Sequence, residues 1–130
     1  RGARLGPAFD RREVEERLRA AGAVFTVVPD ERLFDCIASD LAAGRVVGWF
    51  DGRMEFGPRA LGGRSILADP RDPGMQALVN RKIKFRESFR PFAPAVLRER
   101  AAEYFELEVD SPYMLLTAPV RAAQTMRSRS

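Results

Sequence analysis

Short apolar segments alternate with glycine, proline and aspartate along this sequence, and that alternation limits the chain to short helices and strands. Four segments predict helices: 10–22, 30–44, 73–83 and 98–104. Six others are apolar or β-branched and predict strands: 24–28, 46–50, 54–56, 65–68, 92–97 and 113–117. Helices interspersed with short strands predict an α/β fold of the α+β type.

Two local signals refine this pattern. Asp10 is followed three residues later by Glu13, which is the spacing of a capping box and predicts the start of a helix. Asp51 and Gly52 stand between two apolar segments, which predicts a two-residue turn that joins 46–50 to 54–56 as a hairpin. We therefore expect the sheet to contain a local antiparallel pair.

Size and composition describe an ordinary globular chain. Its 130 residues suffice for one domain with a single core, and 45% of them are hydrophobic and 31% charged. No apolar run approaches the roughly 20 residues of a membrane span, and the N-terminus lacks a signal-peptide core, so we expect no membrane partner. One cysteine cannot form an internal disulfide, which favours a cytoplasmic location.

The sequence contains no histidine. This excludes serine or cysteine nucleophiles paired with histidine, and it removes the commonest metal ligand, so we expect no metal from this segment. Carboxylates within the motifs described below are expected to orient arginines rather than to act as general bases. They are Glu55, Asp69 and Glu87.

Basic residues are concentrated in the middle of the chain. The net charge is +4, yet the segment 53–100 holds eleven basic residues against five acidic ones, a net charge of +6. Such a concentration indicates an anionic partner, either a phosphate-bearing small molecule or a nucleic acid. A solvated surface with no partner is the alternative.

A glycine-rich stretch at 57–65 carries Arg59 and Arg64. Its glycines have the separation of a P-loop, but Gly63 stands at the lysine position and a strand-like segment follows where a P-loop opens a helix. We therefore exclude a P-loop. Glycines still allow backbone N–H groups to approach an anion, and each arginine presents a planar fork to phosphate oxygens. A tight turn with two surface arginines is the alternative.

The segment 81–92 alternates cations with Phe85, Phe89 and Phe92. Aromatic rings interleaved with cations also suit single-stranded RNA, whose bases stack on such rings. The prolines and apolar residues that follow favour phenylalanines that are buried as anchors, with the cations projecting to the other side. We therefore predict a preorganised anion pocket.

These two stretches closely resemble the C-terminal domain of the NodU/CmcH-type carbamoyltransferases, whose members carbamoylate nodulation factors, antibiotics and aminoglycosides. The resemblance covers about 5–120 and is most specific at 57–68 and 85–94. The matching motifs lie at 55–62, 64–68, 80–82, 85–86 and 89–94. Two positions depart from the pattern, Gly63, where many members have asparagine, and Ser88, where proline is frequent. Neither departure removes a cation.

The resemblance implies a YrdC-like fold, a twisted mixed β-sheet flanked by helices. We accordingly expect a linker at 1–8, a partial domain of this type at 9–120, and a mobile or truncated tail at 121–130. In such proteins this domain joins carbamoyl phosphate and ATP into a carbamoyl-adenylate. A separate N-terminal Kae1-like domain, which carries a metal and is expected to be missing here, transfers the carbamoyl group to a hydroxyl of a sugar, nodulation factor or antibiotic.

The motif match nominates six site residues. Arg59, Lys84 and Arg90 are expected as the leading, catalytic ligands of carbamoyl phosphate and the nucleotide phosphates, and we expect the three to converge on one anion site. Arg64, Arg86 and Ser65 are further candidates for substrate and nucleotide binding. The alternative function is an RNA-binding module that uses a basic concave surface without catalysis, although we expect nucleic acid to be the less favoured partner.

Overall fold

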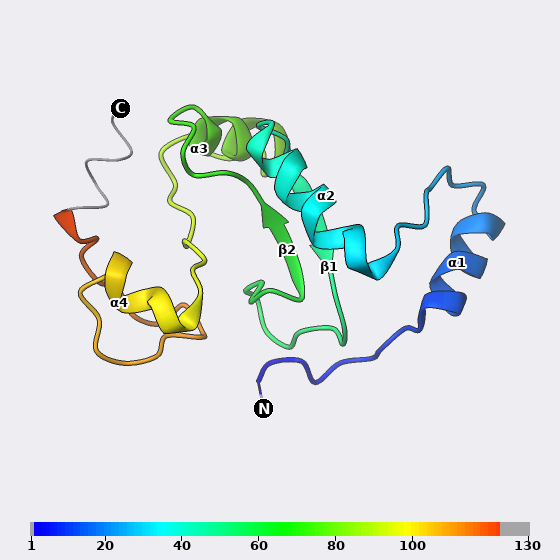
Figure 1. Cartoon of the computed structure of the whole chain (residues 1–130), viewed down its shortest axis with the longest axis horizontal. Coiled ribbons are helices and arrows are strands. Elements are labelled where there is room, and N and C mark those ends of the chain that lie inside the picture. Colours follow the sequence, from blue (N-terminus) through cyan, green and yellow to red (C-terminus); the bar gives the residue numbers. More distant parts are fainter. Residues whose placement is uncertain (1, 123–130) are drawn as a thin grey trace. The chain divides into compact units, whose positions relative to one another are not determined.

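The computed structural model describes residues 2–122, which divide between two compact units, Arg1–Leu67 and Ala68–Ser130. The predicted α+β class is confirmed, because the described part holds four α-helices and a two-stranded antiparallel sheet (Figure 1). This sheet is smaller than the twisted mixed sheet that the resemblance implies. No helix of the described residues is long and apolar enough to cross a membrane. Most of the expected tail, at 123–130, lies outside the described residues.

The first unit begins with helix α1 (Arg11–Ala20), which starts at the predicted cap. The Asp10 carboxylate accepts the Glu13 backbone N–H at 2.8 Å, which satisfies one of the donors that a helix N-terminus leaves free. The Glu13 side chain does not close the box but accepts from Arg17, 2.7 Å away. The helix stops before Gly22, whose φ of +67° suits glycine.

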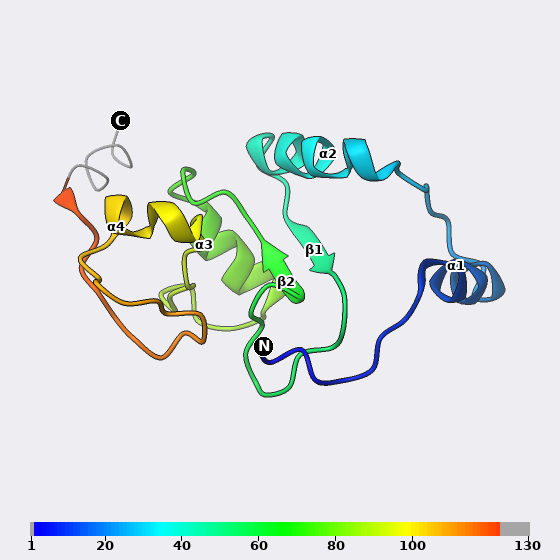
Figure 2. The same ribbon diagram turned by 60° about the horizontal axis from the view of Figure 1, so that its bottom comes forward.

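Helix α2 (Asp30–Ala42) leads through Gly44 into strand β1 (Val47–Phe50), which pairs with β2 (Arg64–Leu67). The register runs from Val47 opposite Leu67 to Phe50 opposite Arg64. The arrows of the two strands point in opposite directions (Figure 2). The connection between β1 and β2, residues 51–63, contains most of the glycine-rich stretch, so the strand pairing closes it into a loop.

The predicted local hairpin is wrong. Gly52 does adopt a turn conformation, with a φ of +66°, but the segment after it does not pair with β1. Met54 instead exchanges backbone hydrogen bonds with Gly6 and Pro7, each at 2.9 Å. The main-chain groups of 54–56 are therefore used by the N-terminal segment, and β1 pairs with the strand beyond the loop.

The second unit starts with helix α3 (Met75–Leu78), which continues directly into the π-helical turn η1 (Val79–Ile83). A 3₁₀ turn η2 (Arg98–Arg100) leads into the short helix α4 (Ala101–Tyr104). These helices lie where the apolar periodicity predicts them.

Besides 54–56, three predicted strands are absent from the described residues, at 24–28, 92–97 and 113–117. In the second of them Pro94 has no N–H to donate to a ladder, which weighs against a strand at that position. The second unit has one isolated bridge among its described residues, between Phe105 and Val120.

Burial corrects a second expectation. Met75 and Val79 are the only buried hydrophobic side chains in residues 2–122, whereas Phe85 and Phe89 are 85% and 79% exposed. The prediction that these phenylalanines anchor their segment from the interior is therefore wrong. The buried position beneath that segment is taken by a polar residue, Asn80, which has no exposed surface.

Candidate functional site

The first candidate loop spans 57–63 and is organised by Glu55. This carboxylate is 5% exposed and accepts the backbone N–H of Leu61 at 3.0 Å and that of Gly63 at 3.0 Å. Gly57 and Gly62 have φ values of +102° and +106°, which glycine adopts without strain. The Glu55 carboxylate therefore fixes the loop by binding its backbone N–H groups.

The Glu55 carboxylate is charged in this setting. Burial raises its pKa, but the N–H donors of Leu61 and Gly63, together with the positive charges of Arg64 and Arg4, outweigh burial and hold the pKa below its ordinary value. Because the charged carboxylate accepts the loop N–H groups more strongly than a neutral carboxyl would, the stability of the 57–63 loop depends on ionisation of Glu55.

We therefore expect the loop to loosen in acid. A carboxylate whose pKa is lower in the folded state stabilises that state above its unfolded pKa, and this contribution is lost as pH falls through the folded pKa. Amide exchange at Leu61 and Gly63 should accelerate, beyond its intrinsic pH dependence, as pH drops below about 4. In Glu55→Gln this acid step should vanish. Protection factors at Leu61 and Gly63 that fall no earlier than those of the rest of the protein during acid titration would contradict the expectation.

Two predicted ligands of this loop take part in its structure. Arg64 donates to the Gly57 carbonyl, and its Nε lies 3.9 Å from Glu55 Oε2. The Ser65 hydroxyl oxygen accepts the Gly62 N–H at 3.2 Å. Arg59, in contrast, is exposed and has no carboxylate partner within residues 2–122. Its guanidinium is therefore the cation of this loop that is open to a ligand.

The second candidate loop spans 80–90 and is organised by Asn80. Its side-chain amide donates to the carbonyls of Ser88 at 3.1 Å and Arg90 at 2.8 Å, and its oxygen accepts from Arg86 Nε at 2.7 Å. The Asn80 carbonyl also accepts the Arg86 N–H at 3.0 Å. One buried side chain thus ties the two ends of the loop together.

The cations of this second loop differ in how many contacts they already make within the protein. Arg86 is held by Asn80 and lies over the Phe92 ring, 4.8 Å from its centre. Arg90 is half exposed, and its nearest carboxylate oxygen, on Glu87, is 3.9 Å away. Lys84 is exposed and forms no ion pair with any described residue. Phe85 beside it has a φ of +50°, a strained conformation of the kind found at functional sites.

The six predicted site residues therefore lie on the two loops and on strand β2, three of them in each unit. The first loop and strand β2 carry Arg59, Arg64 and Ser65, and the second loop carries Lys84, Arg86 and Arg90. A single anion site that combines both groups stays a prediction. Two further cations on the second loop, Arg81 and Lys82, are exposed and were not nominated.

The organising residues were only partly anticipated. Glu55 was expected to orient an arginine, but its principal partners are backbone N–H groups. Asp69 pairs with Arg71, which was not a nominated ligand, and the arginine lowers the pKa of that carboxyl. The sequence does not single out Asn80 as a site residue. One feature of the sequence could have indicated its burial. Asn80 directly follows Val79, which with Met75 forms the buried side of the helical segment α3–η1.

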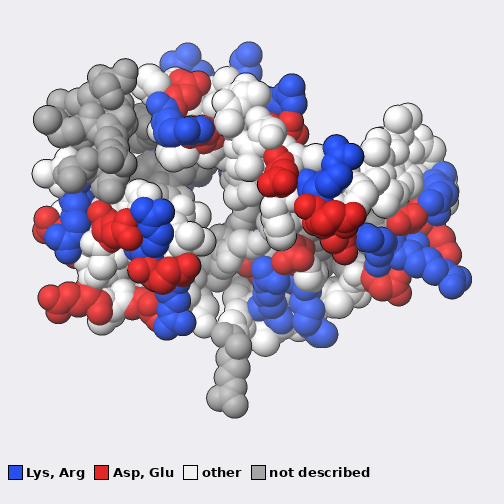
Figure 3. All heavy atoms as spheres, viewed as in Figure 1, with Lys and Arg blue, Asp and Glu red and all other residues white. Residues whose placement is uncertain are grey.

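Charged side chains of both signs intermix on the face shown in Figure 3. The number of basic side chains therefore does not identify a ligand site. A better criterion is whether a cation lacks a carboxylate partner among the described residues.

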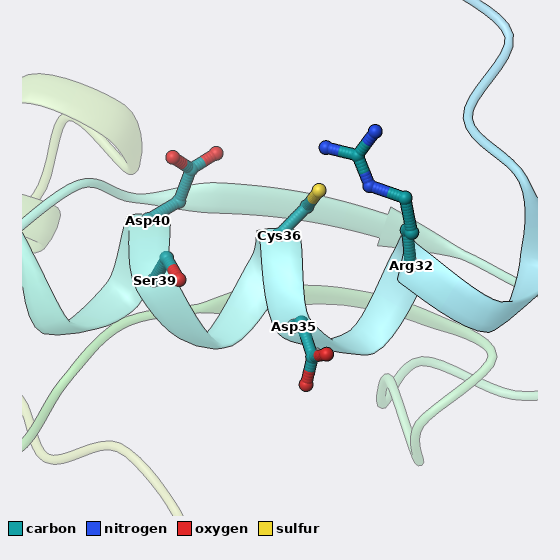
Figure 4. Close-up of a pocket in the computed structure, with 5 residues that line it drawn as sticks. All are labelled: Arg32, Asp35, Cys36, Ser39 and Asp40. Carbon is teal, nitrogen blue, oxygen red and sulfur yellow. The ribbon is translucent and has the colours of Figure 1, made fainter.

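A shallow depression on α2 is a poorer candidate site (Figure 4). It is lined by residues of that one helix: Arg32, Asp35, Cys36, Ser39 and Asp40. Two carboxylates and one guanidinium give it a net negative charge, which disfavours phosphate. The two loops are therefore the better candidates for an anion site.

Comparison with known proteins decides the family. A model of the carbamoyltransferase C-terminus family matches residues 38–129, which include both loops. The chain belongs to this family. Among curated relatives, nodulation protein NolNO of Sinorhizobium fredii is 45% identical over 116 residues, which are 87% of this chain and 17% of the relative. The 3'-hydroxymethylcephem-O-carbamoyltransferase of Streptomyces clavuligerus is 41% identical over 92 residues, 71% of this chain and 18% of that enzyme.

An uncharacterized protein of Synechocystis is 59% identical over 122 residues, covering 92% of this chain and 20% of the relative. The chain thus spans a fifth or less of the length of these three relatives. The predicted family resemblance is confirmed.

Proposed function

We propose that this chain is the part of an O-carbamoyltransferase that binds carbamoyl phosphate and ATP and forms a carbamoyl-adenylate. A Kae1-like N-terminal domain of the same polypeptide then transfers the carbamoyl group to a hydroxyl of a sugar, nodulation factor or antibiotic, in the cytoplasm. One observation carries the proposal. Within the match to the carbamoyltransferase family, two loops fastened by buried polar side chains present Arg59 and Lys84, which form no ion pair with any described residue.

The proposed reaction balances with one water. Water cleaves the P–O bond of carbamoyl phosphate and releases inorganic phosphate and carbamate. A carbamate oxygen then displaces pyrophosphate from the α-phosphorus of ATP, which forms the carbamoyl-adenylate. Both displacements occur at phosphorus, where catalysis depends mainly on in-line placement and on neutralising negative charge.

The residue types on the loops suit that task. Arg59 and Arg90 can contact phosphate oxygens with two parallel N–H groups, while Lys84 acts as a point charge. Cations held in place before substrate arrives stabilise developing charge without reorganisation. The absence of histidine is therefore compatible with the chemistry, since no group that titrates near neutral pH is needed for it.

Ligand binding at two salt concentrations tests the proposal against RNA binding. Titration calorimetry on the natural polypeptide that contains this chain should detect ATP and carbamoyl phosphate, each losing less than about tenfold in affinity between about 50 and 200 mM salt. A polyanion surface with six to ten phosphate contacts loses about 10³–10⁵-fold over that range. Absent ATP and carbamoyl phosphate binding, with tight and steeply salt-dependent binding of single-stranded RNA, would support the RNA-binding alternative instead.

The division of labour between domains gives a separate prediction. We expect the 130-residue chain alone to yield no carbamoylated sugar or antibiotic, because the acceptor site is assigned to the other domain. Mass spectrometry of reactions with ATP, carbamoyl phosphate and acceptor measures this. Carbamoylated acceptor from purified chain, free of full-length enzyme, would refute the assignment.

A further inference from the structure

Asn80 occupies an unusual position for a polar side chain. It lies in the π-helical turn η1, directly after buried Val79, and has no exposed surface. A buried amide that is not hydrogen-bonded costs free energy, so such a group persists only where its partners are supplied. Here the carbonyls of Ser88 and Arg90 accept from its nitrogen, and Arg86 donates to its oxygen.

These contacts require an asparagine's particular set of atoms. The amide nitrogen has two N–H groups, which match the two carbonyls, and the amide oxygen matches one guanidinium N–H. Aspartate would present an oxygen to both carbonyls, and leucine would make none of the three bonds. The Gln76 amide also donates to the Arg90 carbonyl, at 3.1 Å, so that carbonyl is held by two side chains.

The contacts act on the two nominated arginines of this loop in different ways. Asn80 holds the guanidinium of Arg86 directly, whereas it holds Arg90 by its main chain and leaves the Arg90 side chain half exposed. A carbonyl fixed at 2.8 Å limits where the attached side chain can reach. The π-helical turn also fixes the backbone of Lys84. The Lys84 N–H donates to the carbonyl of Val79, the residue directly before Asn80.

We propose that Asn80 is a positioning residue for the site that binds carbamoyl phosphate and ATP, acting through the main chain of Arg90 and the guanidinium of Arg86. The proposal rests on the function proposed above. Asn80 itself does not touch substrate. Its effect on ligand affinity therefore depends on the side chains that it places.

A double-mutant cycle separates positioning from general stabilisation. Asn80→Leu removes all three bonds at similar volume, and Arg90→Ala removes the placed guanidinium while keeping the carbonyl that Asn80 holds. In the natural polypeptide that contains this chain, Asn80→Leu should weaken ATP binding about tenfold. In the Arg90→Ala background, Asn80→Leu should weaken ATP binding about threefold or less, because the Arg90 guanidinium that Asn80 helps to place is already missing.

Asn80→Ser is the second variant, since water can enter the vacated space and the fold is less disturbed. Arg98→Ala is the matched control: Arg98 is an exposed arginine of the same unit that pairs with Asp110, outside both loops, and its loss should leave ATP affinity unchanged. If both Asn80 variants weaken binding equally with and without the Arg90 guanidinium, or if neither weakens it, the positioning role is refuted.

Failure of the proposed function gives a different result. In that case the unsubstituted protein binds neither ATP nor carbamoyl phosphate. If the unsubstituted protein binds both and Arg90→Ala weakens ATP binding, but Asn80→Leu and Asn80→Ser do not, only the inference about Asn80 fails.

Discussion

Alanine at Arg59, Lys84 or Arg90 is expected to weaken binding of ATP or carbamoyl phosphate about 10- to 100-fold for each change. Each substitution removes one charge-assisted contact to a phosphate group, which is worth about 1.5–3 kcal/mol. Arg59 and Lys84 form no ion pair within residues 2–122, and the Arg90 head lies 3.9 Å from its nearest carboxylate. The folded state therefore loses little when these side chains are shortened.

Calorimetry of each variant gives the affinity, and circular dichroism checks the fold. Arg98→Ala and Arg100→Ala serve as matched controls, because both are exposed arginines paired with carboxylates outside the two loops. We expect both controls to bind ATP as the unsubstituted protein does. Unchanged affinity in all three loop variants, with intact folds, would remove the site assignment.

The same variants test whether one site unites the two loops. If Arg59 and Lys84 contact one bound ligand, each single variant should weaken the same binding event, and the double variant should weaken it more than either single variant does. If each substitution instead weakens a different binding event and leaves the other unchanged, the two loops form separate anion sites. An experimental structure in which the three heads face different sides, too far apart for one diphosphate-sized ligand, would equally contradict a shared site.

Glu55→Ala is expected to destabilise the protein far more than the loss of an exposed, ion-paired carboxylate does. It leaves the Leu61 and Gly63 N–H groups without their acceptor, at a cost of about 1–3 kcal/mol for each that water cannot reach. It also removes the anion nearest to Arg64. Denaturant unfolding should therefore show a clearly lower midpoint, with lost amide protection at Leu61 and Gly63.

Glu103→Ala provides the control for this change, because Glu103 is an exposed carboxylate that pairs with exposed Arg100. We expect no measurable shift for it. Glu55→Gln should fall between the two, since its amide oxygen can still accept an N–H but no longer carries charge. Equal midpoints for Glu55→Ala and Glu103→Ala would show that the loop does not depend on the buried carboxylate.

Several parts of the fold follow from local sequence. The start of α1 at the Asp10 cap, the end of α2 before Gly44, and the helical segment at 75–83 are decided by contacts within about four residues. Periodicity and capping residues record such contacts directly. The family was also readable from the sequence, because the motifs at 57–68 and 85–94 are specific enough to stand without any structure.

The amino-acid sequence alone thus predicted the helices, the α+β class, the segments that carry the cations and the family. Only tertiary structure decided that β1 pairs with β2 rather than with 54–56, since two segments of similar β-propensity compete and the N-terminal residues occupy one of them. Tertiary structure likewise placed Asn80 in the interior and left Phe85 exposed. The physical reason is that hydrophobicity predicts a tendency to be buried, whereas the hydrogen-bond partners that allow an amide to be buried, here at Arg86, Ser88 and Arg90, are supplied by the folded chain.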